Sequence, residues 1–181
     1  QLTGGKRIGI VTLSGGLGAI LADKFIGAGL DVPTFPDALQ QQLRDGVPDY
    51  GMVSNPVDVT GNILNNPDFV RSVFSALATS DSIHVVVIYP SGSLLDRMAE
   101  PLLDVCRDYP RLFIAIDTGQ AKSREQLAAG GIPVFTDIGR AIQSIAPFCH
   151  WLAGRESVLE WARLRRATVP VAFNGEIKGL N

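Results

Sequence analysis

The sequence is poor in cysteine, has almost no excess of either charge and contains no long hydrophobic run. Its 181 residues include two cysteines, Cys106 and Cys149, which cannot form the disulfide framework of small secreted proteins. We therefore expect a reducing compartment, the cytoplasm, with both cysteines packed as small hydrophobic residues. The formal net charge of −2 leaves no broad basic surface for nucleic acid or an anionic membrane. No apolar stretch approaches the roughly 18 residues of a membrane-spanning helix, and no signal-peptide core is present.

The composition is that of a globular domain. Hydrophobic residues make up 46% and charged residues 19%, which is enough to build a core. At roughly 150 residues per domain, the length allows one domain and a short extension. We expect a domain over residues 1–154, followed over residues 155–181 by a basic helix and a linker toward a further module. The chain begins at Gln1 rather than at methionine, so we expect a part of a longer protein.

Short β-branched stretches alternate with helical patterns, which is typical of a parallel α/β sheet. The pattern predicts five strands, over residues 7–13, 31–35, 85–88, 112–116 and 132–135. Helices are predicted between and after them, over residues 17–25, 37–44, 67–77, 94–108, 123–129 and 138–149. The fold class is therefore α/β, a three-layer, doubly wound, mainly parallel sheet of the flavodoxin type. Ligands of such folds bind outside the carboxyl ends of the strands.

Asparagine, aspartate and proline mark several element boundaries. Asn66, followed by proline, predicts the start of a helix, and Asp137 is expected to cap the last helix. Pro101 is expected to bend or split its helix, and Pro147 to kink the last one. Residues 45–65 are predicted to be mostly irregular, and irregular segments of this length are usually functional.

A glycine-rich loop, Ser14-Gly15-Gly16-Leu17-Gly18, separates the first strand from its helix. Glycines let the backbone turn tightly and approach a ligand, and the helix start adds unpaired N–H groups and a positive dipole end. We expect these five residues to bind phosphate; the alternative is a turn that needs small residues for packing alone. The loop is not a dinucleotide-binding fingerprint, because the last glycine of G-x-G-x-x-G is missing. It is not a Walker A motif either, because no Gly-Lys-Ser/Thr follows.

A second motif, Asn55-Pro56-Val57-Asp58-Val59-Thr60-Gly61, lies in the predicted irregular segment. Asparagine before proline is expected to be extended, Asp58 and Thr60 can bond local backbone N–H groups, and Gly61 can adopt positive φ. The motif is either a self-satisfied turn or a cover over the glycine loop. In the second case it contributes to a substrate pocket lined by Asn55, Asp58, Thr60, Gly61, Ser91 and Gly92. Asp117-Thr118-Gly119 is expected to open onto the same edge.

No catalytic residue can be assigned from the sequence. His84 precedes a strand and His150 lies on the last helix, so both are expected to be structural or surface residues. The two cysteines lack metal-ligand spacing, and no metal site is predicted. No nucleophile and base can be paired, which indicates a binding module rather than a complete enzyme.

The two motifs together resemble the NDP-forming acyl-CoA synthetases, which are relatives of succinyl-CoA synthetase. The resemblance rests on Ser14-Gly15-Gly16-x-Gly18 followed by Asp23, and on Asn55-Pro56-Val57-Asp58-x-Thr60-Gly61, and it covers about residues 5–153. It implies that a carboxylic acid, CoA and ATP become acyl-CoA, ADP and phosphate through an acyl phosphate and a phosphohistidine. In that scheme the helix behind the glycine loop points at the phosphohistidine, and loops of this domain hold the acid.

The resemblance also implies partners in a longer chain: a CoA-binding domain, a domain with the phosphohistidine and an ATP-grasp module, which together use CoA, ATP/ADP and Mg²⁺. Neither histidine here is followed by the Ser/Thr-Gly pair of the family. We therefore expect residues 1–181 to bind no cofactor and to be inactive alone.

Two other functions stay open. The chain could be a ligand-sensing, synthetase-like module of a protein lysine acyltransferase, or a free-standing flavodoxin-like binding protein. The surfaces expected on such a module are also compatible with a homodimer.

Overall fold

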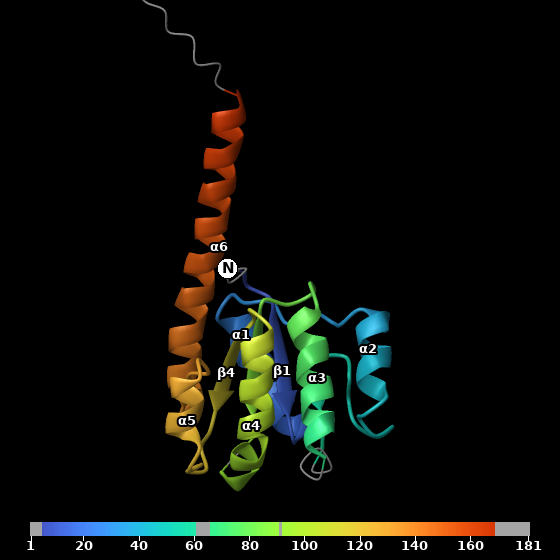
Figure 1. The fold of residues 1–181 in the computed structure, drawn as a ribbon. Coiled ribbons are helices and arrows are strands. Elements are labelled where there is room, and N and C mark those ends of the chain that lie inside the picture. Colours follow the sequence, from blue (N-terminus) through green and yellow to red (C-terminus); the bar gives the residue numbers. More distant parts are fainter. Residues whose placement is uncertain (1–4, 61–65, 91, 169–181) are drawn as a thin grey trace, which may run out of the picture.

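Five parallel strands form the central sheet, in the order β2-β1-β3-β4-β5. The computed structural model describes residues 5–60, 66–90 and 92–168 (Figure 1). The strands are β1 (Ile8–Thr12), β2 (Val57–Asp58), β3 (Val85–Tyr89), β4 (Leu112–Ile116) and β5 (Val134–Phe135). Every strand pair is parallel. The predicted flavodoxin-like class is confirmed, with all strands rather than most of them parallel.

Helices cover both faces of the sheet, which is why β1 and β3 are buried at every residue. One core cluster joins the sheet to α2 (Asp37–Arg44), α3 (Pro67–Thr79), α4 (Ser93–Asp108) and α5 (Arg124–Ala129). The other joins it to α1 (Gly15–Gly27) and to the first half of α6 (Ile138–Thr168). In Figure 1, α3 and α4 lie in front of the sheet and α1 lies behind it.

The predicted caps of two helices are confirmed. The Asn66 side-chain oxygen accepts the N–H groups of Asp68 and Phe69 at the start of α3. Asp137 Oδ1 accepts the N–H of Arg140, at 2.8 Å, in the first turn of α6. These oxygens satisfy donors that the helix itself leaves unpaired.

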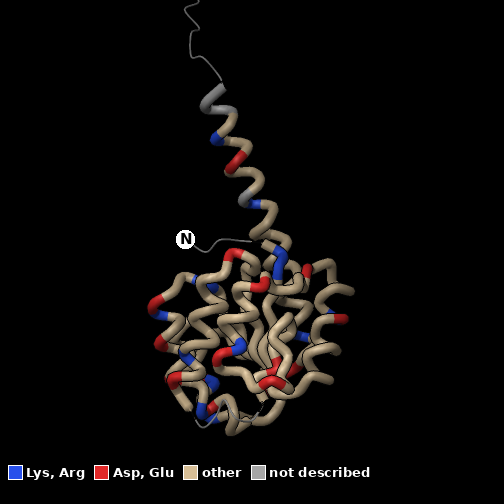
Figure 2. Tube along the Cα trace, turned by 90° about the vertical axis from the view of Figure 1, so that its right-hand side faces the viewer, with Lys and Arg blue, Asp and Glu red and all other residues tan. Residues whose placement is uncertain are grey.

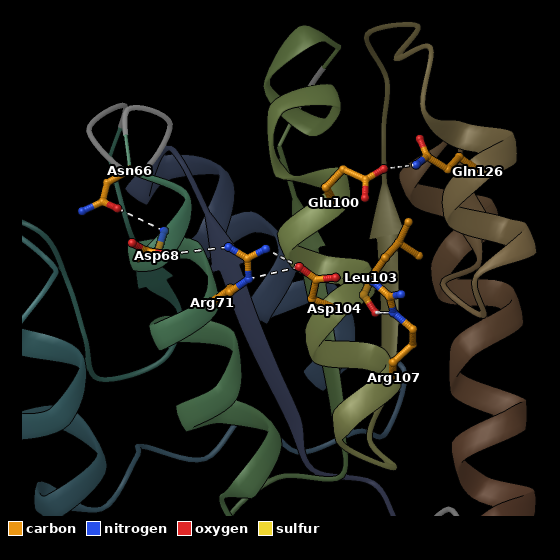
Figure 3. A network of polar contacts seen from close by, with 8 residues as sticks. All are labelled: Asn66, Asp68, Arg71, Glu100, Leu103, Asp104, Arg107 and Gln126. Atoms are coloured by element: carbon orange, nitrogen blue, oxygen red, sulfur yellow. Dashed lines mark hydrogen bonds and ion pairs between the residues drawn. The ribbon is translucent and has the colours of Figure 1, made fainter.

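A network of charges links the outer sides of α3 and α4 (Figure 3). Asp104 of α4 accepts hydrogen bonds from Arg71 of α3 and from Arg107 one turn further along α4. The hydrogen bond from Arg71 is the main reason that the pKa of Asp104 lies below its usual value. Because these side chains are partly exposed, the network aligns two helices and contributes little stability. Elsewhere acidic and basic residues are interspersed, as Figure 2 shows.

The prediction of a strand over residues 31–35 is wrong. Only Asp31 forms an isolated bridge, to Arg7, and the edge strand is instead β2, which lies inside the segment predicted to be irregular. Its residue Val57 is fully buried and pairs with Val11. A two-residue strand with proline before it carries no alternating pattern, so its position is set by tertiary contacts.

Two predictions about helices need correction. Pro101 does not split α4, which runs unbroken from Ser93 to Asp108. Likewise α6 continues through Pro147 and Gly154 to Thr168, so the basic segment predicted separately after residue 154 belongs to the same helix. The predicted linker from residue 169 onward lies outside the described residues.

The histidines and cysteines have structural positions. His84 Nδ1 accepts the N–H of Arg7 at 3.2 Å, and His150 Nε2 donates to the carbonyl of Ala28 at 3.2 Å. Cys149 is fully buried, and burial raises the pKa of its thiol to about 11. Cys106 is partly buried. Within the described ranges, no helix is long and apolar enough to cross a membrane.

Candidate functional site

The candidate site lies where the carboxyl ends of β1, β2 and β3 meet. The strand order reverses here: β1 leads into α1 on one face of the sheet, and β3 leads into α4 on the other. A crevice opens outside the sheet at such a reversal, because the two loops leave in opposite directions. The glycine loop, Asp58–Thr60 and Gly92 lie at this edge, whereas Asn55 lies beside the middle of β1.

The glycine loop begins with a fixed backbone turn. Thr12, which is 1% exposed, uses its hydroxyl to accept the N–H of Ser14 at 3.1 Å and to donate to the Ser14 carbonyl at 3.2 Å. Ser14 is the N-cap of α1 in an extended conformation, yet its side chain makes no capping hydrogen bond. The helix has no acidic residue in its first turn. No side chain of Ser14 or of the first turn of α1 therefore offsets the positive end of the helix.

Each glycine of the loop has a different reason to lack a side chain. A Cβ on Gly18 would lie 2.9 Å from Pro56 Cβ and 3.0 Å from Thr12 Cγ2, so Gly18 lets the second motif pack onto the helix. A Cβ on Gly15 would lie 3.4 Å from Asp58 Oδ2. A Cβ on Gly16 would meet no atom within 4 Å, so packing within the described chain does not explain this glycine.

Asn55 anchors the second motif to the edge of β1. Its side-chain oxygen accepts the N–H of Ile10 at 3.0 Å, and its side-chain nitrogen donates to the carbonyls of Ile8 and Pro33, both at 2.9 Å. The side chain thus occupies the place of a neighbouring strand between the Asp31 bridge and β2. The expected extended backbone at Asn55 is wrong: φ is +88° and the bond to Pro56 is cis.

Asp58 and Thr60 form a local turn, as predicted. Asp58 Oδ1 accepts the N–H of Thr60 at 3.0 Å. Thr60 itself has a φ of +55°, the conformation that was expected at Gly61. Gly61 lies outside the described residues. The motif therefore contains the predicted turn satisfied by its own side chain, and its Pro56 also packs against Gly18 of the glycine loop.

Asp117 ties the loop after β3 to the loop after β4. Its carboxylate is fully buried and accepts the N–H groups of Gly92, Ala121 and Gly119 at 2.7, 2.7 and 2.9 Å. Arg124 adds a charged hydrogen bond from Nε at 2.6 Å. Burial raises the pKa of Asp117, but these four donors outweigh it, and the net pKa is lowered.

Gly92 needs to be glycine at this junction. Its φ is +56° with ψ −125°, and a Cβ would lie 2.7 Å from the carbonyl oxygen of Gly119. Gly92 is the N-cap of α4 and offers no side chain to its first turn. A second helix start therefore points at the same edge as α1. The neighbouring predicted residue, Ser91, lies outside the described residues.

Sequence reasoning placed Asp117 at this edge but missed Arg124 as its partner. A buried carboxylate directly after a strand, with arginine seven residues later, was the available signal. Tyr89 and Thr118 are a second missed pair, with their hydroxyl oxygens 2.9 Å apart. The contact of Tyr89 with Thr118 joins residues 29 apart in the chain, whereas Asp117 and Arg124 are only seven apart and lie in the same connection after β4.

The described groups at this edge are helix N-termini, a carboxylate and structured turns. The described residues contain no cluster of three potential metal ligands. His84 and His150 are bonded to backbone groups elsewhere. The site offers helix N–H groups, a carboxylate and turns that hold them in place.

Comparison with known proteins gives one consistent result. Residues 8–90 match the family model of the Ligase-CoA domain. The chain is 30% identical over 152 residues to trans-feruloyl-CoA synthase FCS1 of an unknown prokaryotic organism, covering 78% of this chain and 22% of that protein. It is 27% identical over 154 residues to the alpha subunit of ADP-forming acetate–CoA ligase I of Pyrococcus furiosus. This match covers 81% of this chain and 33% of that subunit.

Solved structures share the fold. PH0766 from Pyrococcus horikoshii OT3 superposes with a TM-score of 0.72 at 20% identity, over 83% of this chain and 36% of that one. A second structure is the dinucleotide-forming acetyl-coenzyme A synthetase 1 of Ca. Korarchaeum cryptofilum in complex with phosphate and ADP. It superposes with a TM-score of 0.71 at 17% identity, over 94% of this chain and 37% of that one. The chain thus spans between about a fifth and two fifths of the length of these proteins.

Replacing Asn55 tests whether its amide holds the second motif in place. Asn55→Ala leaves the N–H of buried Ile10 without its partner and is expected to lower the free energy of unfolding by about 2–4 kcal/mol. Asn66→Ala, which removes a helix cap, serves as the matched control and is expected to cost about 1 kcal/mol. Urea unfolding of both variants measures the difference. A smaller loss for Asn55→Ala than for Asn66→Ala would contradict the anchoring role.

Replacing Asp117 tests the junction of the two loops. Asp117→Asn is expected to destabilise the domain by about 3 kcal/mol near neutral pH, because a buried charge pair loses one partner. The pKa of Asp117 is lower in the folded protein than in the unfolded chain. The ionised carboxylate therefore contributes fully to the free energy of unfolding above the unfolded-state pKa of about 3.9, and this contribution is lost as the pH falls through the folded-state pKa. The variant and the parent should therefore converge in stability in acid. The exposed Asp23→Asn serves as the control, and a constant difference down to about pH 2 would argue against the assignment.

Two glycine replacements test the contact between the motifs. Gly18→Ala is expected to lower stability by about 1–3 kcal/mol, since the new Cβ must displace Pro56 or Thr12. Gly16→Ala is expected to leave the free energy of unfolding unchanged or to raise it by up to about 1 kcal/mol. The new Cβ meets no neighbouring atom, and alanine is more favourable than glycine within a helix. Thermal unfolding of the two variants in parallel measures both effects. Equal losses at the two positions would contradict the packing described for Gly18.

Proposed function

Because the chain is a distant homologue of the NDP-forming acetyl-CoA synthetases, sharing their Ligase-CoA domain over residues 8–90, we propose that it serves as one domain of an acid–CoA ligase. The overall reaction converts a carboxylate, CoA and ATP into acyl-CoA, ADP and phosphate. In this proposal CoA and nucleotide bind to other domains of a longer protein. This domain holds a phosphate at the start of α1 and helps to enclose the acid.

The observation that carries the proposal is the open position at Gly16. A Cβ there would meet nothing within 4 Å, and the Ser14 side chain does not cap the helix. The backbone is thus bare where the dipole and the free N–H groups of a helix favour an anion. Phosphate, or a phosphoryl group carried by another domain, fits this position, and Ser14, Gly15, Gly16, Leu17 and Gly18 are the proposed contacts.

The acid is proposed to bind beside this position. Asp58 lies close to the glycine loop, since a Cβ added to Gly15 would be 3.4 Å from Asp58 Oδ2, and Thr60 and Gly92 flank the same edge. Asn55 contributes by positioning rather than by contact, since its amide is already bonded to the backbone of β1 and Pro33. Gly61 and Ser91 complete the proposed acid-binding set from the sequence.

Phosphate binding can be tested on residues 1–181 directly. Titration with inorganic phosphate, followed by amide NMR, is expected to shift the resonances of Gly16, Leu17 and Gly18. Gly16→Val should abolish these shifts, because its side chain fills the open position, while Gly27→Val, at the other end of α1 and equally free of neighbours, should retain them. Shifts that persist in Gly16→Val would contradict the proposed phosphate site.

The ligase role requires the longer protein. Incubation with γ-labelled ATP and Mg²⁺, without CoA, is expected to give an acid-labile, base-stable phosphoenzyme that disappears when CoA and a carboxylic acid are added. The Gly16→Val variant of that protein should lose turnover and the Gly27→Val variant should keep it. A complete absence of label would favour a ligand-sensing module instead.

A further inference from the structure

A charged pair, Asp117 and Arg124, lies next to the start of α4. The Asp117 side chain is 0% exposed and that of Arg124 is 30% exposed. Arg124 bonds Asp117 twice, from Nε to the carboxylate Oδ2 at 2.6 Å and from Nη2 to the main-chain carbonyl at 3.0 Å. Burying a charged pair is costly, and well-packed apolar residues of similar size often give equal or greater stability. Stability alone therefore gives little reason for a charged pair at this position.

The pair holds two strained positions of the backbone. Gly92 has a φ of +56°, and Gln120, in the connection after β4, has a φ of +62° although it is not glycine. The Asp117 carboxylate accepts the N–H groups on both sides of Gln120, at 2.9 and 2.7 Å. It also accepts the N–H of Gly92, at 2.7 Å. Strained conformations persist only where their surroundings over-determine them, and they cluster at active sites and ligand-binding sites.

Arg124 is one side chain away from the start of α4. It bonds Asp117 Oδ2, and Oδ1 of the same carboxylate accepts the N–H of Gly92. A second contact runs in the opposite direction, because Asp96 in the first turn of α4 accepts the N–H of Ser123 at 2.8 Å. A change at Arg124 therefore reaches the backbone of Gly92 through a single intermediate group.

We propose that Asp117 and Arg124 are positioning residues for the acid-binding part of the candidate site. Each oxygen of the buried carboxylate already accepts two hydrogen bonds, so Asp117 acts on the acid through the backbone of Gly92 rather than by contact. This inference rests on the proposed function, because it takes the acid to bind beside Gly92. The glycine loop is held separately, by the hydroxyl of Thr12, so phosphate binding at α1 does not require the pair.

Binding of acetate and of inorganic phosphate to residues 1–181, followed by amide NMR, tests the proposal. In the parent chain, acetate is expected to shift the resonance of Gly92, and phosphate those of Gly16 and Leu17. Arg124→Gln is expected to raise the dissociation constant for acetate at least about tenfold, because contacts weaken when the group that positions them is displaced. The same variant should leave the dissociation constant for phosphate unchanged.

Arg107→Gln is the matched control for the loss of an arginine. Arg107 also bonds an aspartate, Asp104, but on the outer side of α4 (Figure 3), so its replacement should leave both dissociation constants unchanged. Arg124→Lys keeps the charge but cannot make both contacts with Asp117. It should give an intermediate loss of acetate binding, and it takes the place of Arg124→Gln if that variant does not fold. All titrations are made below the unfolding transition of each variant.

Three results would overturn the proposal. They are the absence of an acetate-dependent shift at Gly92 in the parent chain, unchanged acetate binding in Arg124→Gln, and equal losses of acetate and phosphate binding, which indicate a purely structural role. Failure of the proposed function gives different results. In that case phosphate leaves Gly16 unshifted in the parent chain, or the longer protein shows no ligase turnover, while the effect of Arg124→Gln on acetate binding remains.

Discussion

The side chain of Asn55 is the contact on which the candidate site depends. By bonding to Ile8, Ile10 and Pro33, it completes the edge of β1 where no continuous strand is present. This fixes Pro56 against Gly18 and directs Val57 and Asp58 into the short strand β2. A segment with little regular structure thereby has one position, because unpaired strand-edge groups next to a buried core are costly.

The same edge of the sheet collects two helix starts that no side chain caps. The starts of α1 and α4 lie on opposite faces, and the loops that lead to them are held by Thr12 and by Asp117. Both anchors are buried polar groups whose hydrogen bonds are made to backbone atoms. Rigid loops that lead into helix N-termini favour the binding of an anion, and this is the physical basis for the proposed phosphate role.

Most of the architecture was predictable because strong local signals agreed with the tertiary fold. The apolar runs that became β3 and β4, the Asn66 cap and the helical spacing of Val70, Val73 and Phe74 each predicted the observed element. The errors occurred where local signals were weak or misleading. Residues 31–35 have strand-like composition but form one bridge, and of the two effects predicted for Pro101, a bend or a split, the split does not occur.

The sequence by itself determined the α/β class, most of the helices and strands, the glycine loop behind the first strand and the resemblance to acyl-CoA synthetases, because periodicity and motif spacing are local properties. Only the tertiary structure decided that Pro56 packs on Gly18, that Asn55 replaces a strand and that Tyr89 contacts Thr118. These features depend on contacts between segments far apart in the chain, and no local pattern of residues specifies which distant group fills a given space.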